Sequence, residues 1–173
     1  MVKFLLDSNI FIQAKNFHYK LEFCEGFWSW IEMAHTNGLV CSIKKVKAEL
    51  ALGKPGDPAR LWADAMPPNF FLDDDQDGSL MTHYGKVISK ISSSIHYTQA
   101  AKNEFAEYTR ADAFLIAAAL RHNAVVVTHE KGNPDQKKRV PIPDGGLLLG
   151  VQSLTIFELL EKHAHKPNFT FKP

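Results

Sequence analysis

Four acidic side chains stand where an apolar pattern of the sequence stops or is interrupted. Asp7 and Glu130 each come just after a short apolar run. Glu49 lies in the segment after a third such run, and Asp112 opens an alanine-rich apolar segment. If these carboxylates meet, their repulsion raises some of their pKa values and strains the fold unless a cation binds. Because hard divalent ions prefer oxygen ligands, the set predicts a site for Mg²⁺ or Mn²⁺.

Such a site has a definite chemistry. One metal ion, or two held about 3.5–4 Å apart, would activate a water and stabilise the leaving oxygen of a phosphodiester. Asn9 and Thr128 stand close in sequence to two of the acids, and we expect them to orient carboxylates or water through hydrogen bonds. Asp144 is an alternative to Glu130 as the fourth acid. The number of metal ions stays open.

Each acid also has a purely structural interpretation. Asp7 would cap the helix that follows it, and Thr109 with Asp112 has capping-box spacing. Glu49 would be a solvated helix residue and Glu130 an ordinary turn residue. Taken one at a time, these structural roles are the commoner ones. The order and placement of the whole set are what favour the metal site.

The basic residues gather in two clusters, although the net charge of +1 gives the whole molecule no strong field. Both clusters would flank the proposed metal site, where they could neutralise RNA phosphates, and a solvated surface is the alternative. The first cluster is Lys44, Lys45 and Lys47, with Arg110 as a further member, and the second is Lys131, Lys137, Lys138 and Arg139.

The elements that must position these residues follow from hydrophobic periodicity. Apolar runs without a helical period predict buried strands at 3–6, 38–43 and 124–128, with weaker strand candidates at 70–72 and 140–142. Apolar residues at helical spacing predict helices between them. These helices span 21–36, 44–52, 59–65, 79–93, 98–108, 111–122 and 154–163.

Strands that alternate with helices predict an α/β fold with three layers, α/β/α, around a mostly parallel central sheet of four to five strands. The chain of 173 residues fits one domain over 1–173. In such sheets functional groups gather beyond the carboxyl ends of the strands, where Asp7 and Glu130 are expected. Alanines on helix 111–122 would let it approach the sheet and bring Asp112 to the same place.

Two further patterns carry expectations. Residues 73–78 imitate the first half of a calcium-binding loop, but Tyr84 stands where the loop needs a glutamate, so an acidic turn that caps the next helix is expected instead. In helix 21–36, Phe23 and Phe27 lead the apolar face. Trp28 lies off that face and could contact a dimer or antitoxin partner.

The acids and their surroundings resemble the PIN-domain nucleases. The matching elements are Leu5-Leu6-Asp7-Ser8-Asn9, Glu49 after the second strand, Ala111-Asp112-Ala113, and Val126-Val127-Thr128-His129-Glu130. The sequence is most similar to the small prokaryotic PIN toxins of toxin–antitoxin pairs, the VapC-like group, and to an uncharacterised, longer PIN-like branch. The resemblance covers nearly the whole chain in order.

This resemblance implies a Mg²⁺- or Mn²⁺-dependent endoribonuclease that acts on RNA, with a cognate antitoxin as partner and a homodimer as a further possibility. It maps metal-binding and catalytic carboxylates onto Asp7, Glu49 and Asp112. The family usually has Asp as the fourth acid. Here Thr128 fits the pattern but the acid is Glu130, one methylene longer, which could act through water.

Two other function classes remain open. The chain could be a non-catalytic PIN-like module that binds RNA or protein. A haloacid-dehalogenase-type phosphatase would want a second aspartate at position 9, where Asn9 stands. No apolar stretch reaches the roughly 18 residues of a membrane span, and no signal peptide is evident. Cys24 and Cys41 do not suggest a disulfide framework, so a cytoplasmic protein without a membrane partner is expected.

Overall fold

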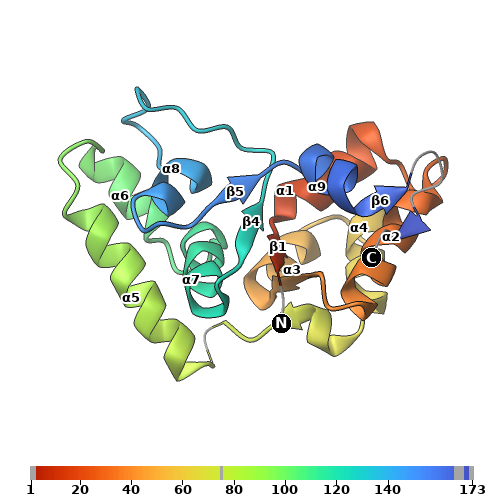
Figure 1. The fold of residues 1–173 in the computed structure, drawn as a ribbon. Helices are drawn as coiled ribbons and strands as arrows, with labels where there is room; N and C mark the ends of the chain where they lie inside the picture. The colour runs from red at the N-terminus through yellow and green to blue at the C-terminus, as the bar shows by residue number, and fades with distance from the viewer. Residues whose placement is uncertain (1–2, 75, 166–169, 172–173) are drawn as a thin grey trace.

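The computed structural model describes residues 3–74, 76–165 and 170–171, and its centre is a five-stranded sheet (Figure 1). All of its strand pairs are parallel, in the order β3-β2-β1-β4-β5. This confirms the predicted α/β class and parallel sheet. The strands are β1 (Phe4–Leu6), β2 (Val40–Ile43), β3 (Phe71–Leu72), β4 (Val125–Val127) and β5 (Ser153–Leu154).

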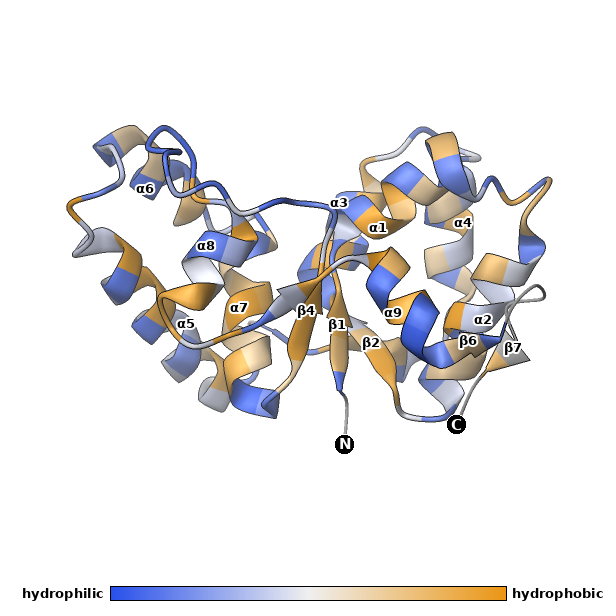
Figure 2. Ribbon diagram, turned by 45° about the horizontal axis from the view of Figure 1, so that its top comes forward, coloured by the Kyte–Doolittle hydropathy of each residue, from blue (hydrophilic) through white to orange (hydrophobic). Residues whose placement is uncertain are grey.

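Helices cover both faces of the sheet. Figure 2 shows α5 and α7 on one side of the strands and α2, α4 and α9 on the other. The helices are α1 (Ser8–Gln13), α2 (Glu25–Thr36), α3 (Lys44–Ala51), α4 (Pro58–Ala65), α5 (Gly78–Ser92), α6 (Gln99–Phe105), α7 (Asp112–His122), α8 (Ile142–Leu147) and α9 (Ile156–His163). A π-helical turn η1 (Ala14–His18), a 3-10 turn η2 (Pro68–Phe70) and a separate antiparallel pair, β6 (Ala164–His165) with β7 (Thr170–Phe171), complete the described chain.

The central strand β1 fixes where the chemistry can gather. Phe4 is in register with Val40 on one side and with Val125 on the other. Leu5 and Leu6 are fully buried, as a strand covered on both faces requires. Because β1 and β4 run parallel, the residues that follow Leu6 and Val127 emerge side by side at the carboxyl edge of the sheet.

Helix α7 packs directly on the sheet. It contacts β1, β2 and β4, and α5 packs against its outer side. Every residue from Ala113 to Ala119 is buried. The small alanine side chains allow the close approach that was expected, and this approach carries the first residue of the helix, Asp112, to the carboxyl edge.

The predicted strand at 140–142 is wrong. The edge strand is β5, and residues 142–147 form α8 instead. Pro141 and Pro143 explain the difference, because proline has no N–H to donate to a strand ladder but suits the first turn of a helix. Ser153 and Leu154 form only a two-residue strand and are half-buried, so no apolar run marked them.

The predictions for Phe23 and Trp28 are also wrong. Helix α2 begins at Glu25, which leaves Phe23 outside it and 82% exposed. Trp28 is only 1% exposed, and its Nε1 donates to the carbonyl oxygen of Tyr19 over 2.7 Å. Its ring also packs edge-on against Trp62 of α4. A helix enclosed by several neighbours buries more than one narrow stripe, so Trp28 is a core residue and not a partner contact.

Polar side chains satisfy backbone N–H groups at the starts of three helices. Asp77 caps α5 by accepting hydrogen bonds from the backbone of Ser79 and Leu80, which confirms the acidic turn. Asp74 accepts from the backbone N–H of Lys45 at 2.6 Å. Thr155 caps α9 through a complete capping box.

The sequence also carried expectations about disulfides and membrane spans. Cys24 and Cys41 are both free thiols, as predicted. Among the described residues, no helix has the length and apolarity that a membrane crossing requires.

Candidate active site

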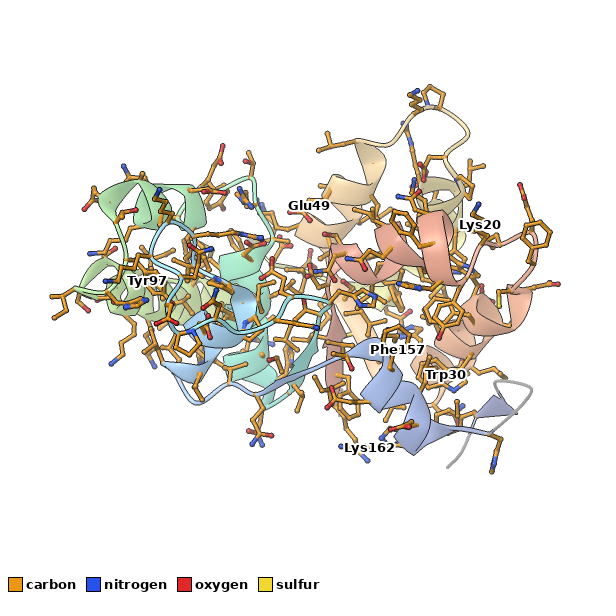
Figure 3. The ribbon with its side chains drawn as sticks, turned by 90° about the horizontal axis from the view of Figure 1, so that it is seen from above. Lys20, Trp30, Glu49, Tyr97, Phe157 and Lys162 are labelled. Carbon is orange, nitrogen blue, oxygen red and sulfur yellow. The ribbon has the colours of Figure 1, made fainter. Side chains whose placement is uncertain are left out.

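All four predicted acids line one cavity of about 490 Å³ at the carboxyl edge of the sheet. Asp7 follows β1, Glu49 lies in α3, Asp112 begins α7, and Glu130 follows β4. Figure 3 looks onto this edge and labels Glu49. The sequence-predicted set is therefore brought together by four separate elements. Asn9, Thr109, Arg110 and Arg139 contribute to the same wall.

Asp7 is held by short hydrogen bonds and is only 4% exposed. One carboxylate oxygen accepts the backbone N–H of Ser8 at 2.7 Å, so Asp7 does cap α1. The other accepts the hydroxyl of Thr128 at 2.8 Å. The structural and the functional interpretations of Asp7 are therefore compatible, because the cap uses one oxygen and leaves the carboxylate at the cavity.

Thr128 and Asn9 form the predicted support for Asp7. The Thr128 hydroxyl donates to Asp7 and accepts from Asn9 Nδ2 at 2.9 Å and from the backbone N–H of Glu130 at 3.1 Å. Asn9 Oδ1 in turn accepts the backbone N–H of His129 at 3.0 Å. This network ties the end of β1 to the end of β4.

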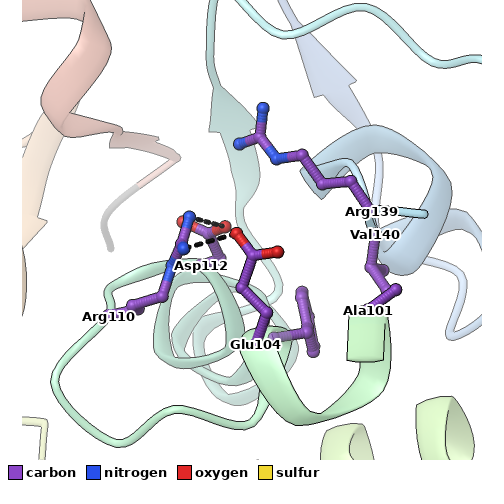
Figure 4. Close-up of a pocket in the computed structure, with 7 residues that line it drawn as sticks. Ala101, Glu104, Arg110, Asp112, Arg139 and Val140 are labelled. Carbon is purple, nitrogen blue, oxygen red and sulfur yellow. Dashed lines mark hydrogen bonds and ion pairs between the residues drawn. The ribbon is translucent and has the colours of Figure 1, made fainter. Parts of the chain in front are cut away.

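Asp112 is not explained by the capping box considered from the sequence. Helix α7 is preceded by Ala111, which makes no side-chain cap, and Thr109 instead lines the cavity. Asp112 lies 3.7 Å from the guanidinium of Arg110, which also pairs with Glu104 at 2.6 Å. Figure 4 shows these two contacts of Arg110.

Glu49 and Glu130 also hold the backbone in place. Glu49 accepts the backbone N–H of Ala111 at 2.9 Å, so it joins α3 to the start of α7 and is not simply solvated. Glu130 accepts the backbone N–H of Ile142 at 2.8 Å and forms an ion pair with Arg139. Both glutamates connect elements that surround the cavity.

Of the two candidates for the fourth acid, Glu130 lies at the cavity and Asp144 does not. Glu130 lines the cavity, whereas Asp144 lies in α8 and accepts the backbone N–H of Asn133 at 2.8 Å. Asp144 is not one of the described residues that line the cavity.

The electrostatics of the cavity match a cluster of acids that repel one another. Burial, and next the charge of Asp112, raise the pKa of Asp7 to about 7, while the hydrogen bond from Thr128 opposes the rise. Burial, and next the charge of Glu130, raise the pKa of Asp112 to about 6, while Arg110 opposes it. A bound cation would relieve this repulsion.

The donor chemistry suits a hard divalent cation, but the carboxylates are not already gathered around one point. Among the described residues, no group of three or more histidine, cysteine, aspartate or glutamate side chains is close enough to hold a metal ion. Glu130 is engaged by Arg139, and Asp112 faces Arg110. A cation would therefore have to draw the carboxylates inward and compete with these two arginines.

The three lysines of the first predicted basic cluster do not line the cavity. Lys44 forms an ion pair with Asp73, and Lys47 lies 3.5 Å from Asp64. The ammonium of Lys45 lies 4.0 Å from the ring centroid of Tyr108. These three lysines are therefore engaged outside the residues that line the cavity.

Arg110 and Arg139 do line the cavity. Arg139 belongs to the second basic cluster, which was expected to flank the metal site, but its contact with Glu130 was not predicted. No spacing rule marks that contact, because it depends on the path of the segment after β4.

A comparison with known families gives one match. The model of a family described as Domain of unknown function (DUF4411) matches residues 4–166, a range that contains all four acids and both arginines of the cavity. No curated protein gives a significant match to the chain.

Proposed function

We propose that the chain, which belongs to the DUF4411 family, is a metal-dependent endoribonuclease that hydrolyses RNA phosphodiester bonds. The observation that carries the proposal is the meeting of Asp7, Glu49, Asp112 and Glu130 in one cavity. The raised pKa values of Asp7 and Asp112 support it, because burial and next a neighbouring carboxylate disfavour their charged forms, and a divalent cation would favour those forms.

The four carboxylates would hold Mg²⁺ or Mn²⁺, which supplies Lewis acidity for attack of water on a phosphodiester. The residues of the chain position the reactants. Thr128 fixes the orientation of Asp7, and Asn9 fixes Thr128. Because these hydrogen bonds already fix the carboxylate, it would lose little conformational freedom on binding a metal ion. Groups that hydrogen-bond to a metal ligand usually have this role.

The two cavity arginines would meet the charge of the substrate. Arg110 and Arg139 present guanidinium groups on the same wall as the acids, and guanidinium pairs well with phosphate oxygens. Arg139 would exchange Glu130 for a phosphate when substrate enters. The arginines would then balance the charge of the phosphate, which could bind although the cavity also contains acids.

The choice of RNA, and not another phosphodiester, depends on the resemblance to PIN-domain nucleases. The same resemblance supports the role of toxin in a toxin–antitoxin pair, with a cognate antitoxin as partner. A homodimer belongs to the same set of proposals. These assignments are separate from the chemistry and are tested by identifying the proteins that co-purify with the chain and by measuring its oligomeric state.

The test compares cleavage of a mixed RNA pool by the wild-type protein and by Asp7→Asn, with Mn²⁺, with Mg²⁺ and with a chelator. We expect the wild type to cleave only with metal and Asp7→Asn to lose at least about 100-fold in rate, as expected when a metal ligand is removed. Asp144→Asn is the matched control, because Asp144 is an acid outside the cavity wall. Full activity of Asp7→Asn would refute the site.

A second candidate is a PIN-like module that binds RNA or protein without cutting. The observation that favours it is that the chain's own groups already engage the acids, with Arg139 on Glu130 and Arg110 near Asp112. Such a module would bind RNA equally well with and without Mn²⁺ and would show no cleavage of the pool.

A further inference from the structure

Three aromatic rings meet at the carboxyl edge of the sheet, beside the acidic cavity. The ring centroids of His18 and His129 are 5.9 Å apart, those of His18 and Phe157 are 5.6 Å apart, and those of His129 and Phe157 are 5.7 Å apart. We call these three residues the aromatic triad. They come from η1, from the residues after β4 and from α9, and Figure 3 labels Phe157 on this edge.

The triad is open to solvent where a core cluster would be closed. Phe157 is 45% exposed and His18 is also exposed, while His129 is half-buried. Phe17, whose ring centroid lies 6.3 Å from that of His18, is 73% exposed. Several aromatic faces in one exposed place are unusual for a surface without a ligand.

The triad is joined to the acidic cavity by direct bonds. His129 is the chain neighbour of Thr128 and Glu130, and its backbone N–H donates to Asn9 Oδ1 at 3.0 Å. Asn9 lines the cavity and also donates to Thr128, which holds Asp7. A group resting on the triad would therefore be placed at a fixed position relative to the acids.

One exposed lysine follows the triad closely along the chain. Lys131 lies two residues after His129 and forms no ion pair with another described residue. Lys137 and Lys138 are also exposed but lie further along, where the carbonyl oxygen of Lys137 accepts the backbone N–H of Thr98 at the start of α6. Aromatic faces together with unpaired cations form the combination that binds single-stranded nucleic acid, since bases stack on the rings and phosphates pair with the cations.

We propose that the aromatic triad is a nucleobase-binding subsite, on which an unpaired base of the substrate stacks next to the phosphodiester that the acids act on. This inference rests on the proposed nuclease function for its biological meaning. The occupant is a base and not a partner protein, because the triad is small, contains two imidazoles and is joined through Asn9 to the cavity that holds the acids. A base within a duplex could not reach the rings, so the subsite requires a single strand.

The experiment measures RNA binding separately from cutting. In an Asp7→Asn background without divalent metal, fluorescence anisotropy would compare a short oligouridylate and oligoadenylate with an abasic phosphodiester of the same length. We expect Phe157→Leu to weaken binding of the oligonucleotides about fivefold or more, because leucine keeps an apolar side chain but removes the stacking face. Phe157→Trp should retain the affinity.

Two controls make the result specific. Binding of the abasic strand should not change with Phe157→Leu, and Ile95→Ala should not change binding of any strand, because Ile95 is fully exposed between α5 and α6. Equal oligonucleotide affinity of Phe157→Leu and its parent would overturn the subsite. A change in self-association by sedimentation, with RNA affinity unaltered, would also overturn it in favour of a protein contact.

The failures of the two proposals can be told apart. If the wild type cleaves RNA with Mn²⁺ and Phe157→Leu leaves binding intact, the nuclease proposal survives and the subsite fails. If binding depends on Phe157 and on the bases but no cleavage occurs under any metal condition, the subsite survives and the nuclease proposal fails.

Discussion

The carboxylate of Asp7 makes two structural hydrogen bonds and also lies at the cavity. Its backbone ends a buried strand, and its carboxylate caps α1 with one oxygen while Thr128 holds the other. Both bonds favour the charged form, yet burial and the charge of Asp112 outweigh them and raise its pKa to about 7. The residue is therefore positioned at the expense of stability, which is common for groups at functional sites.

The raised pKa predicts how stability depends on pH. Asp7 titrates near 3.8 when unfolded and near 7 when folded, so the folded state binds its proton more tightly. Its contribution to the free energy of unfolding is full below about pH 4, falls as pH rises towards 7 and is constant above. Without metal, we expect Asp7→Asn to be more stable than the wild type at pH 8 by about 1–3 kcal/mol, and no more stable at pH 4.

Urea unfolding at both pH values measures this difference, and Asp144→Asn is the control. A wild-type stability that rises between pH 4 and pH 8 by as much as that of Asp7→Asn would contradict the assignment. Asp112 acts in the same direction, since its pKa is raised to about 6, so Asp7→Asn should reduce the pH dependence and not remove it.

Thr128 gives a second prediction at the scale of one residue. Its hydroxyl donates to Asp7 and accepts from Asn9 and from the backbone of Glu130. We expect Thr128→Val, which keeps the shape but removes the hydroxyl, to cost about 1–3 kcal/mol of stability at pH 8, because buried polar atoms lose their partner. Thr128→Ser should restore most of it in the same thermal unfolding assay, and equal losses for both variants would show that packing, not the hydroxyl, matters.

At the scale of elements, the segment between β4 and α8 controls the open side of the cavity. It contributes Glu130 at one end and Arg139 near the other, and the two side chains pair across it. Glu130 also accepts the first backbone N–H of α8. Movement of this segment would therefore change both the charge of the cavity and the start of the helix.

Arg139→Gln tests whether this ion pair competes with a cation. Removal of the guanidinium frees Glu130, so Mn²⁺ affinity measured by calorimetry should rise about two- to fivefold, the range expected for a partly exposed ion pair. Lys138→Gln removes a neighbouring exposed charge that forms no ion pair with another described residue, so it should leave the affinity nearly unchanged. A fall in Mn²⁺ affinity for Arg139→Gln would show that Arg139 supports the site and does not oppose it.

The elements also show what sequence patterns can and cannot provide. Strand β4 and helix α7 were predictable, because valine runs and alanine-rich helices have strong local signals. The acids were predictable as a group because the ends of parallel strands share one edge. The location of Trp28 was not, because its burial depends on α4 and on the true start of α2.

The same limit applies to the site. Asp112 and Glu130 could be placed near Asp7, but their pairing with Arg110 and Arg139 could not, since such contacts depend on the path of irregular segments. The edge strand β5 escaped prediction for a related reason. Two residues without an apolar run form a strand only because β4 offers them a ladder.

For the whole molecule, metal and pH should act together on stability. A cation that binds only the folded cavity stabilises the protein by mass action, and it needs Asp7 and Asp112 ionised. At a Mn²⁺ concentration about tenfold above the dissociation constant, the unfolding midpoint at pH 8 should rise by about 3–6 °C. At pH 5.5 the rise should be smaller, because protons compete for the carboxylates.

Differential scanning fluorimetry with Mn²⁺, with Mg²⁺ and with Ca²⁺ at both pH values would check this. Asp7→Asn should show little response to any of them. An increase of the midpoint at pH 5.5 equal to that at pH 8 would indicate that the metal binds elsewhere.

The pairing of Phe4 with Val125 places the first strand beside one that the ribosome makes much later. When only the chain up to α3 has emerged from the ribosome, it carries Asp7 and Glu49 but lacks Asp112 and Glu130. The cavity closes only after translation has passed α7 and β4, so long-range pairing delays folding of the centre. For a ribonuclease, this delay would spare the messenger that encodes it until synthesis is nearly finished.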